Sequence, residues 1–201
     1  MKSTEVVTEG GLKNLVLFAA LLATASPALA EGSANFIIGQ RSMSDDDIWG
    51  TLDGQPTFGA KVAVAGEGWP VFIAIGAYYS YDKMSDTFFG LGTVDFSGSV
   101  SEVSLGALKE WKLKHGFRPF IEGGMAAVAA HEAASGPGFH LSETDTGTGF
   151  YGAGGVYWRI GSRLNVGVDV RALRGANIQI GDVSGDADYV QYGLLVGWGW
   201  D

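Results

Sequence analysis

An acidic stretch near the start of the chain contains residue types that could bind a divalent cation. Asp45, Asp46 and Asp47 are consecutive, and Asp53 follows beside a glycine. Calcium prefers several oxygen ligands, and these carboxylates could supply some of them. However, the stretch lacks the D-x-D-x-D-G spacing of a calcium loop, and adjacent aspartates point in different directions. We therefore expect a solvated loop with weak cation bridging and no specific metal site.

A histidine and a serine two residues apart could form part of a hydrolytic site. His140 and Ser142 lie in the segment "FHLS". A histidine can deprotonate a serine for attack on an ester when an acidic group orients the histidine. The downstream segment "GFYGAGGVYW" supplies no acid, and Glu143 is close in sequence to the pair. We expect the pair to lie in a glycine-rich loop, so catalysis is the less favoured interpretation.

A third group of charged residues lies within segments that are otherwise apolar or small. Its members are Arg41, Lys61, Glu102, Glu110, Glu122, Arg159, Asp169 and Arg171. If a fold enclosed them together, they would have to pair with one another, because an unpaired buried charge is costly. A structural ion-pair network is the favoured interpretation. A narrow ion-conducting path or a small-ligand site is the alternative.

The segments that carry these charges alternate in polarity with a period of two residues, which is typical of β-strands. In residues 164–171, leucine and valine alternate with asparagine, glycine, aspartate and arginine. The pattern recurs in 58–64, 69–81, 101–111 and 188–200, and less regularly in 117–130 and 149–160. Residues 34–42 are the most ambiguous, and Arg41 is placed on the inner face by its charge alone. The apolar face is expected to point outward and the polar face inward.

The connections between these segments alternate in length. Short links occur at 66–69, 113–116 and 160–163, whereas long polar connections occur at 42–54, 82–98, 131–147 and 174–188. Short turns at one end and long loops at the other are typical of small outer-membrane barrels. The sequence therefore predicts an all-β fold, an eight-stranded antiparallel up-and-down transmembrane β-barrel with strands of roughly ten residues. Its lumen would be only wide enough for side chains.

Aromatic residues near the ends of the expected strands fit girdles at the two membrane interfaces. They are Trp69, Tyr79, Tyr81, Trp111, Trp158, Trp198 and Trp200.

The first thirty residues have the features of a secretory signal peptide. A lysine-flanked apolar core runs from Leu15 to about Ala25, and a small-x-small motif ends at Ala30. The core is shorter than the ~20 residues that a membrane-spanning helix needs. We expect residues 1–30 to be the signal peptide, cleaved after Ala30, and 31–201 to be one outer-membrane barrel domain.

The composition agrees with a membrane barrel. The chain has 32 glycines, 12% aromatic residues and only 17% charged residues, and it has no cysteine. Its net charge of −9 argues against nucleic acid, which requires a basic face.

Several segments resemble the small outer-membrane β-barrel superfamily, the OmpA-like and OmpX-like proteins. The resemblance is carried by "PFIEGGMAAVAA", "YGAGGVYWRIGSRLNVGVDVRAL" and "YVQYGLLVGWGW". The opening "FIIGQRSMSDDDIWG", with "QPTFGAKV" and "WPVFIAIG", resembles one branch of these proteins in Gram-negative bacteria. The family usually ends in an aromatic residue that the barrel-assembly machinery recognises, whereas here Asp201 follows Trp200. His140-x-Ser142 is also similar to the spacing in lipid A deacylase barrels.

The resemblance implies a scaffold without a catalytic role. We expect a non-enzymatic barrel in the outer membrane of a Gram-negative bacterium, a structural, adhesive or envelope-interaction protein that acts through its four long acidic loops. Its expected partners are outer-membrane lipids, lipopolysaccharide and, during biogenesis, the assembly machinery; it is expected to be a monomer without a cofactor. The alternative is a narrow porin-like or ligand-binding barrel. A lipid A-modifying hydrolase using His140 and Ser142 is more remote.

Overall fold

The computed structural model describes residues 31–44, 49, 54–88, 92–180 and 183–201. The expected signal peptide, residues 1–30, and the acidic residues Asp45, Asp46, Asp47 and Asp53 lie outside the described residues, so these expectations stay predictions. Within the described part of the chain, no helix is long and apolar enough to cross a membrane.

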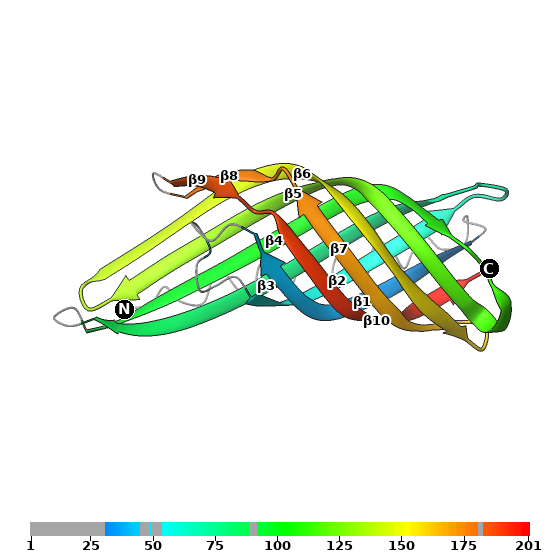
Figure 1. Ribbon diagram of the computed structural model, residues 1–201, viewed down its shortest axis with the longest axis horizontal. Coiled ribbons are helices and arrows are strands. Elements are labelled where there is room, and N and C mark those ends of the chain that lie inside the picture. The colour runs from blue at the N-terminus through cyan, green and yellow to red at the C-terminus, as the bar shows by residue number, and fades with distance from the viewer. Residues whose placement is uncertain (1–30, 45–48, 50–53, 89–91, 181–182) are drawn as a thin grey trace.

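Eight long antiparallel strands close into a barrel in the order β1-β10-β7-β6-β5-β4-β3-β2 (Figure 1). Their bounds are β1 Glu31–Met43, β2 Gly54–Ala65, β3 Phe72–Phe88, β4 Gly92–Glu110, β5 Phe117–Gly136, β6 Phe139–Ile160, β7 Leu164–Arg174 and β10 Tyr189–Trp200. The first and last strands pair along their whole length, from Gly32 opposite Trp200 to Met43 opposite Tyr189. The predicted up-and-down barrel is therefore confirmed.

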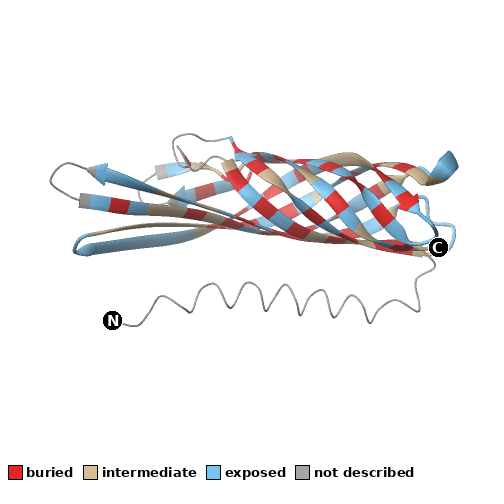
Figure 2. Ribbon diagram, turned by 90° about the horizontal axis from the view of Figure 1, so that it is seen from below, coloured by how far each residue is buried: buried red, intermediate tan, exposed pale blue. Residues whose placement is uncertain are grey.

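Each strand of the barrel wall presents apolar side chains outward, whereas its inward face carries charged and polar side chains together with small and some large apolar ones. In β7, Val166, Val168 and Val170 are exposed, whereas Asp169 and Arg171, which alternate with them, are buried. Figure 2 shows this alternation as a chequered pattern of buried and exposed residues around the barrel. Since successive side chains of a strand point to opposite faces, the two-residue period of the sequence places its apolar half on the outside.

The short links close one end of the barrel. They comprise residues 66–71, residues 111–113 with the 3-10 turn η3 (Lys114–Gly116), and residues 161–163. Gly68 and Gly161 have φ angles of +76° and +63° in two of these links, a conformation that glycine adopts without a steric penalty. The end of β10 lies at the same end of the molecule (Figure 1).

At the other end, two expected loops are strands instead. Residues 82–98 and 131–147 belong almost entirely to the β3–β4 and β5–β6 hairpins, which continue past the rim of the barrel (Figure 1). β3 pairs with β2 only as far as Ser80, and β6 pairs with β7 only from Phe150 onward. Beyond those points the four strands still pair with one another. We call this sheet the outer extension: residues 81–88, 92–99, 131–136 and 139–144.

The prediction of long loops there was wrong because polar and small residues on the outward face hide the alternation of the strands. The barrel strands are accordingly longer than the roughly ten residues expected, and β6 reaches 22 residues. The connection 174–188 also contains regular structure, the small sheet of β8 (Asn177–Ile180) and β9 (Val183–Asp186).

Candidate functional site: a filled lumen beneath an outer sheet

The centre of the lumen is occupied by two arginines that share one carboxylate. Nη2 of Arg41 lies 3.2 Å from one oxygen of Glu102, and Nη2 of Arg171 lies 2.5 Å from the other. The hydroxyl of Tyr189 donates to Glu102 at 2.5 Å and accepts from Nε of Arg171 at 2.9 Å. Arg41 also donates to the amide oxygen of Gln191 at 3.0 Å. Both arginine side chains are fully buried, so these contacts replace their hydration.

A lysine with two carboxylates extends this arrangement along the axis of the barrel. Nζ of Lys61 lies 2.8 Å from Glu122 and 3.0 Å from Asp169. Tyr151 donates to the second oxygen of Glu122 at 2.8 Å, and Nη1 of Arg171 lies 3.8 Å from the same oxygen. Glu122 therefore joins the lysine to the arginine pair.

The middle ionic network, as we call this set, is neutral. Its three cations are Arg41, Lys61 and Arg171, and its three carboxylates are Glu102, Glu122 and Asp169. Aromatic rings cover the guanidinium groups, with Arg41 3.8 Å from the ring centre of Tyr189 and Arg171 3.6 Å from that of Tyr151. Cation–π contacts of this kind add favourable electrostatics where water is excluded.

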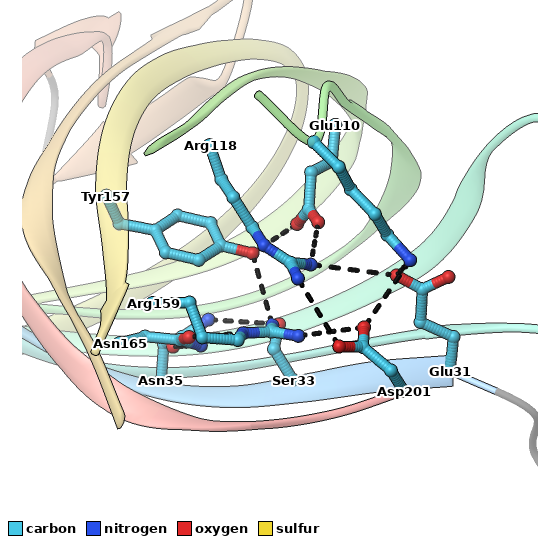
Figure 3. A network of polar contacts seen from close by, with 10 residues as sticks. Glu31, Ser33, Asn35, Glu110, Arg118, Tyr157, Arg159, Asn165 and Asp201 are labelled. Carbon is cyan, nitrogen blue, oxygen red and sulfur yellow. Dashed lines mark hydrogen bonds and ion pairs between the residues drawn. The ribbon is translucent and has the colours of Figure 1, made fainter. Parts of the chain in front are cut away.

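The two remaining charges of the sequence-predicted set, Glu110 and Arg159, lie elsewhere, in a polar cluster at the short-turn end (Figure 3). Arg118 contacts Glu110 at 2.6 Å, and Tyr157 donates to the other oxygen of Glu110. Arg159 donates to Asn165 at 2.9 Å. We call this set the end cluster.

Asp201 binds three cations of the end cluster. Its carboxylate lies 3.0 Å from Arg159, 3.4 Å from Arg118 and 3.4 Å from Lys112. Partial burial would raise the pKa of Asp201, but the three positive charges outweigh this effect and hold the pKa below its usual value. Glu31 contacts Lys112 at 2.5 Å, so residues from both ends of the barrel sequence meet here (Figure 3).

An apolar layer separates the two ionic groups. It consists of Ala63, Ala74, Leu108, Phe120, Tyr157 and Leu195, which we call the inner apolar layer. A second apolar group, the outer apolar cluster, fills the opposite mouth of the lumen. Its members are Met43, Trp49, Val100, Ala126, Val128, Ala130, Tyr151, Leu173, Ala176, Ile178, Ala187 and Tyr189.

The four layers follow in the same order along the strands. On β4, Val100 belongs to the outer apolar cluster, Glu102 to the middle ionic network, Leu108 to the inner apolar layer and Glu110 to the end cluster. The neighbouring strand β5 meets the layers in reverse at Arg118, Phe120, Glu122 and Val128. The lumen is therefore filled along its length by alternating ionic and apolar layers.

The outer mouth is closed by connections as well as by strands. Trp49 is 1% exposed, and its Nε1 donates to the backbone carbonyl of Asp186 at 3.3 Å. Ala176 and Ile178 pack into the same outer apolar cluster, and the backbone amide of Ala176 donates to the carboxylate of Asp188 at 3.1 Å. The segment around β8 and β9 thus lies over the mouth of the lumen.

Several buried lumen residues were not in the predicted set of charged residues: Tyr78, Tyr151, Tyr189 and Gln191. Their alternation with outward residues was the signal for their inward position, and it already placed Tyr151 and Gln191 opposite the apolar face. Glycine was a second signal that could have located Tyr78. A Cβ on Gly59 would lie 2.3 Å from the ring of Tyr78, so that wall position must lack a side chain.

The aromatic residues expected at the membrane interfaces are mostly exposed. Trp69, Trp111, Trp158 and Trp198 lie toward the short-turn end, with exposed fractions of 42–55%. Tyr79 lies on β3 near the rim, Tyr81 is the first residue of the outer extension on the same strand, and Trp200 is half-buried. Their role at two membrane interfaces stays a prediction.

The prediction that His140 and Ser142 lie in a loop was wrong, because both belong to β6. Both side chains are exposed on the outward face of the outer extension. The residue that pairs with His140 is Ser135, which cannot orient an imidazole as a carboxylate would. Among the described residues, no group of three or more histidine, aspartate and glutamate side chains could hold a metal ion.

No protein-family model matches the sequence, and no curated protein matches it. Solved structures match the fold. Ail, the attachment invasion locus protein of Yersinia pestis, in complex with the heparin analogue sucrose octasulfate, aligns with a TM-score of 0.58 and 11% identity, covering 85% of this chain and 98% of Ail. A major outer membrane protein from Thermus thermophilus aligns with a TM-score of 0.51 and 13% identity, covering 85% of this chain and 99% of that protein.

Neisserial surface protein A aligns with a TM-score of 0.50 and 12% identity, covering 84% of this chain and 95% of that protein. At these identities the likeness concerns the fold. The chain therefore has the eight-stranded barrel fold of small outer-membrane proteins.

Proposed function

We propose that this protein is a non-enzymatic barrel of a Gram-negative outer membrane, which anchors in lipid and presents the outer extension as a surface for interactions at the cell envelope. The observation that carries this proposal is a change of polarity at the rim. Below the rim the outward face is apolar, with Leu105 and Phe150 exposed by 59% and 69%. Above it, the outward face carries Lys83, Asp95 and His140.

The apolar belt supports membrane anchoring. Exposed aliphatic and aromatic side chains follow every strand of the wall, and a soluble protein rarely exposes a contiguous apolar surface of this extent. The exposed tryptophans toward the short-turn end of the belt suit a membrane interface there. Short turns on one side and the outer extension on the other suit a periplasmic and an outer side.

The filled lumen supports an anchor rather than a conduit. A hydrated path would need polar space through all four layers, whereas the inner apolar layer and the outer apolar cluster interrupt the ionic groups. A soluble ligand-binding barrel would carry its polar side chains on the outside, whereas here charged side chains lie inside and exposed apolar side chains cover the outer face of the wall.

The structural neighbours support the same class, since Ail is named for attachment and invasion. A sulfated ligand such as the one bound to Ail does not suit this chain. The net charge of −9 and the carboxylates of the outer extension would repel it.

Fractionation of a Gram-negative host tests the proposal. We expect the protein in the outer-membrane fraction, released only by detergent, and migrating faster on a gel before boiling than after it. A water-soluble monomer whose mobility is indifferent to detergent and heat would contradict the proposal.

A further inference from the structure

The outer extension has a polar outward face and an inward face that combines apolar and acidic side chains, whereas the barrel wall beneath it is apolar on the outside. The pairing registers run without interruption from the wall into the extension, so each strand keeps its alternation across the rim. Side chains that continue the inner face of the lumen therefore form the inward face of the extension.

Three rows of residues make up this inward face, one above another. The row nearest the barrel is Asp82, Gly98, Glu132 and Glu143; the next is Met84, Phe96, Ala134 and Leu141; the last is Asp86, Val94, Gly136 and Phe139. The middle row is entirely apolar, and acidic groups border it on both sides.

The apolar rows are partly open to solvent. Leu141 is 66% exposed and Phe139 is 40% exposed. Phe139 packs against its neighbours, because a Cβ on Gly136 would lie 2.5 Å from its ring and 3.3 Å from Val94. The surface is thus ordered within the sheet and still accessible.

Four carboxylates lie on this face: Asp82, Asp86, Glu132 and Glu143. No lysine or arginine of the described outer extension lies on it, since Lys83 points outward. Glu132 and Glu143 are directly opposite each other on neighbouring strands, where like charges destabilise a sheet. One oxygen of Glu132 is buried without a hydrogen-bond partner. A cation placed beside these two residues would relieve the repulsion between their carboxylates.

We propose that the inward face of the outer extension binds a cationic amphipathic peptide segment, with its apolar side chains on the row of Leu141 and its lysine or arginine side chains at Glu132 and Glu143. This inference rests on the proposed function, which places the extension outside the membrane. A second copy of this chain would bring the same carboxylates face to face, and anionic lipopolysaccharide would be repelled.

Peptide binding to the full barrel in nanodiscs of a zwitterionic lipid tests the inference. The probes are a fluorescent peptide of leucine and lysine and its counterpart of leucine and glutamate, with empty nanodiscs as the blank. We expect the lysine peptide to bind with an affinity that falls as salt screens the carboxylates, and the glutamate peptide to show no binding.

Variants then locate the site. The double variant E132Q/E143Q removes both carboxylates and should weaken binding of the lysine peptide by about tenfold. A tenfold loss of affinity corresponds to ~1.4 kcal/mol, which we expect the two lost charge contacts to account for together. L141S should also weaken it. The matched control D95N removes a carboxylate from the outward face of the same sheet and should leave binding unchanged.

Two results would overturn the inference: equal binding of the glutamate peptide, or unchanged binding of the lysine peptide to E132Q/E143Q. Heat-modifiable mobility of each sample reports separately on the inserted barrel. An inserted barrel that binds no peptide contradicts this inference and leaves the proposed function standing, whereas a chain that does not insert contradicts the proposed function itself.

Discussion

At the scale of single residues, the middle ionic network shows how a transmembrane lumen can hold charges at low cost. Every carboxylate of the network contacts a cation, and tyrosine hydroxyls donate hydrogen bonds to the carboxylates of Glu102 and Glu122. A buried ion pair of this kind is weak support for stability by itself, but removing one partner leaves an uncompensated charge.

Replacing Lys61 with methionine should destabilise the barrel. The side chain of Lys61 is 1% exposed and contacts both Glu122 and Asp169. In K61M these two buried carboxylates lose the cation that they share. We expect a loss of roughly 3–5 kcal/mol in the free energy of unfolding, measured with urea in lipid vesicles. The double variant K61M/D169N restores neutrality and should recover part of that loss; equal stabilities of K61M and the unaltered protein would contradict the role of the network.

Asp201 should make the end cluster sensitive to pH. Because its pKa is lowered in the folded barrel, its contribution is fully present above the ordinary aspartate pKa of about 4 and is lost as pH falls through the lowered value. At neutral pH we expect D201N to unfold at a lower temperature than the unaltered protein. This difference in unfolding temperature should disappear at acid pH. Gel mobility after heating at a series of pH values measures it. A difference that stays constant down to the acid limit would show that Asp201 acts without its charge.

At the scale of elements, the change of polarity at the rim predicts where lipid ends. A charged residue near the middle of the bilayer costs about 2–4 kcal/mol on the lipid face of a barrel, and little near the interface. Leu105 and Thr93 lie on the outward face of the same strand, below and above the rim. L105R should therefore lose stability by about that amount in urea unfolding, whereas T93R, opposite the uncharged Thr87, should be nearly neutral. Equal losses would place both residues in the same environment.

The strands and their orientation could be predicted from the sequence because a two-residue period needs only local information. The inward position of Lys61 or Asp169 follows from the same parity. Their contact does not, since it joins residues 108 positions apart and depends on a register that one sequence does not encode visibly. The division of the charges into two layers, with Glu110 and Arg159 in the end cluster, was hidden for the same reason.

The outer extension was missed for a different physical reason. The outer extension lies above the rim and needs no continuous apolar outward face. Its strands therefore contain serine, alanine and glycine at positions where the wall has valine and leucine. Sequence reasoning therefore interpreted 82–98 and 131–147 as loops. The pairing of β4 with β5 from Asp95 opposite Ser135 onward makes them a sheet.

At the scale of the whole molecule, the layered lumen predicts that the protein conducts no ions. Planar bilayers containing the protein should show no conductance above background, because the inner apolar layer would exclude ions even if the outer mouth opened. W49A, which removes a fully buried ring from the outer apolar cluster, should remain silent as well. Steady channels from either protein would contradict the filled lumen.

The closure of the barrel joins residues from the first and last strands. The side chains of Arg41 and Gln191, 150 residues apart in sequence, meet only when β1 pairs with β10. Contacts between such distant residues form late, because the long intervening chain must be ordered first. A sheet in which β1 has not paired with β10 would leave Arg41 without Gln191 and without the ring of Tyr189. We therefore expect the network to act as a checkpoint of assembly: its contacts are complete only in a barrel whose last strand has docked.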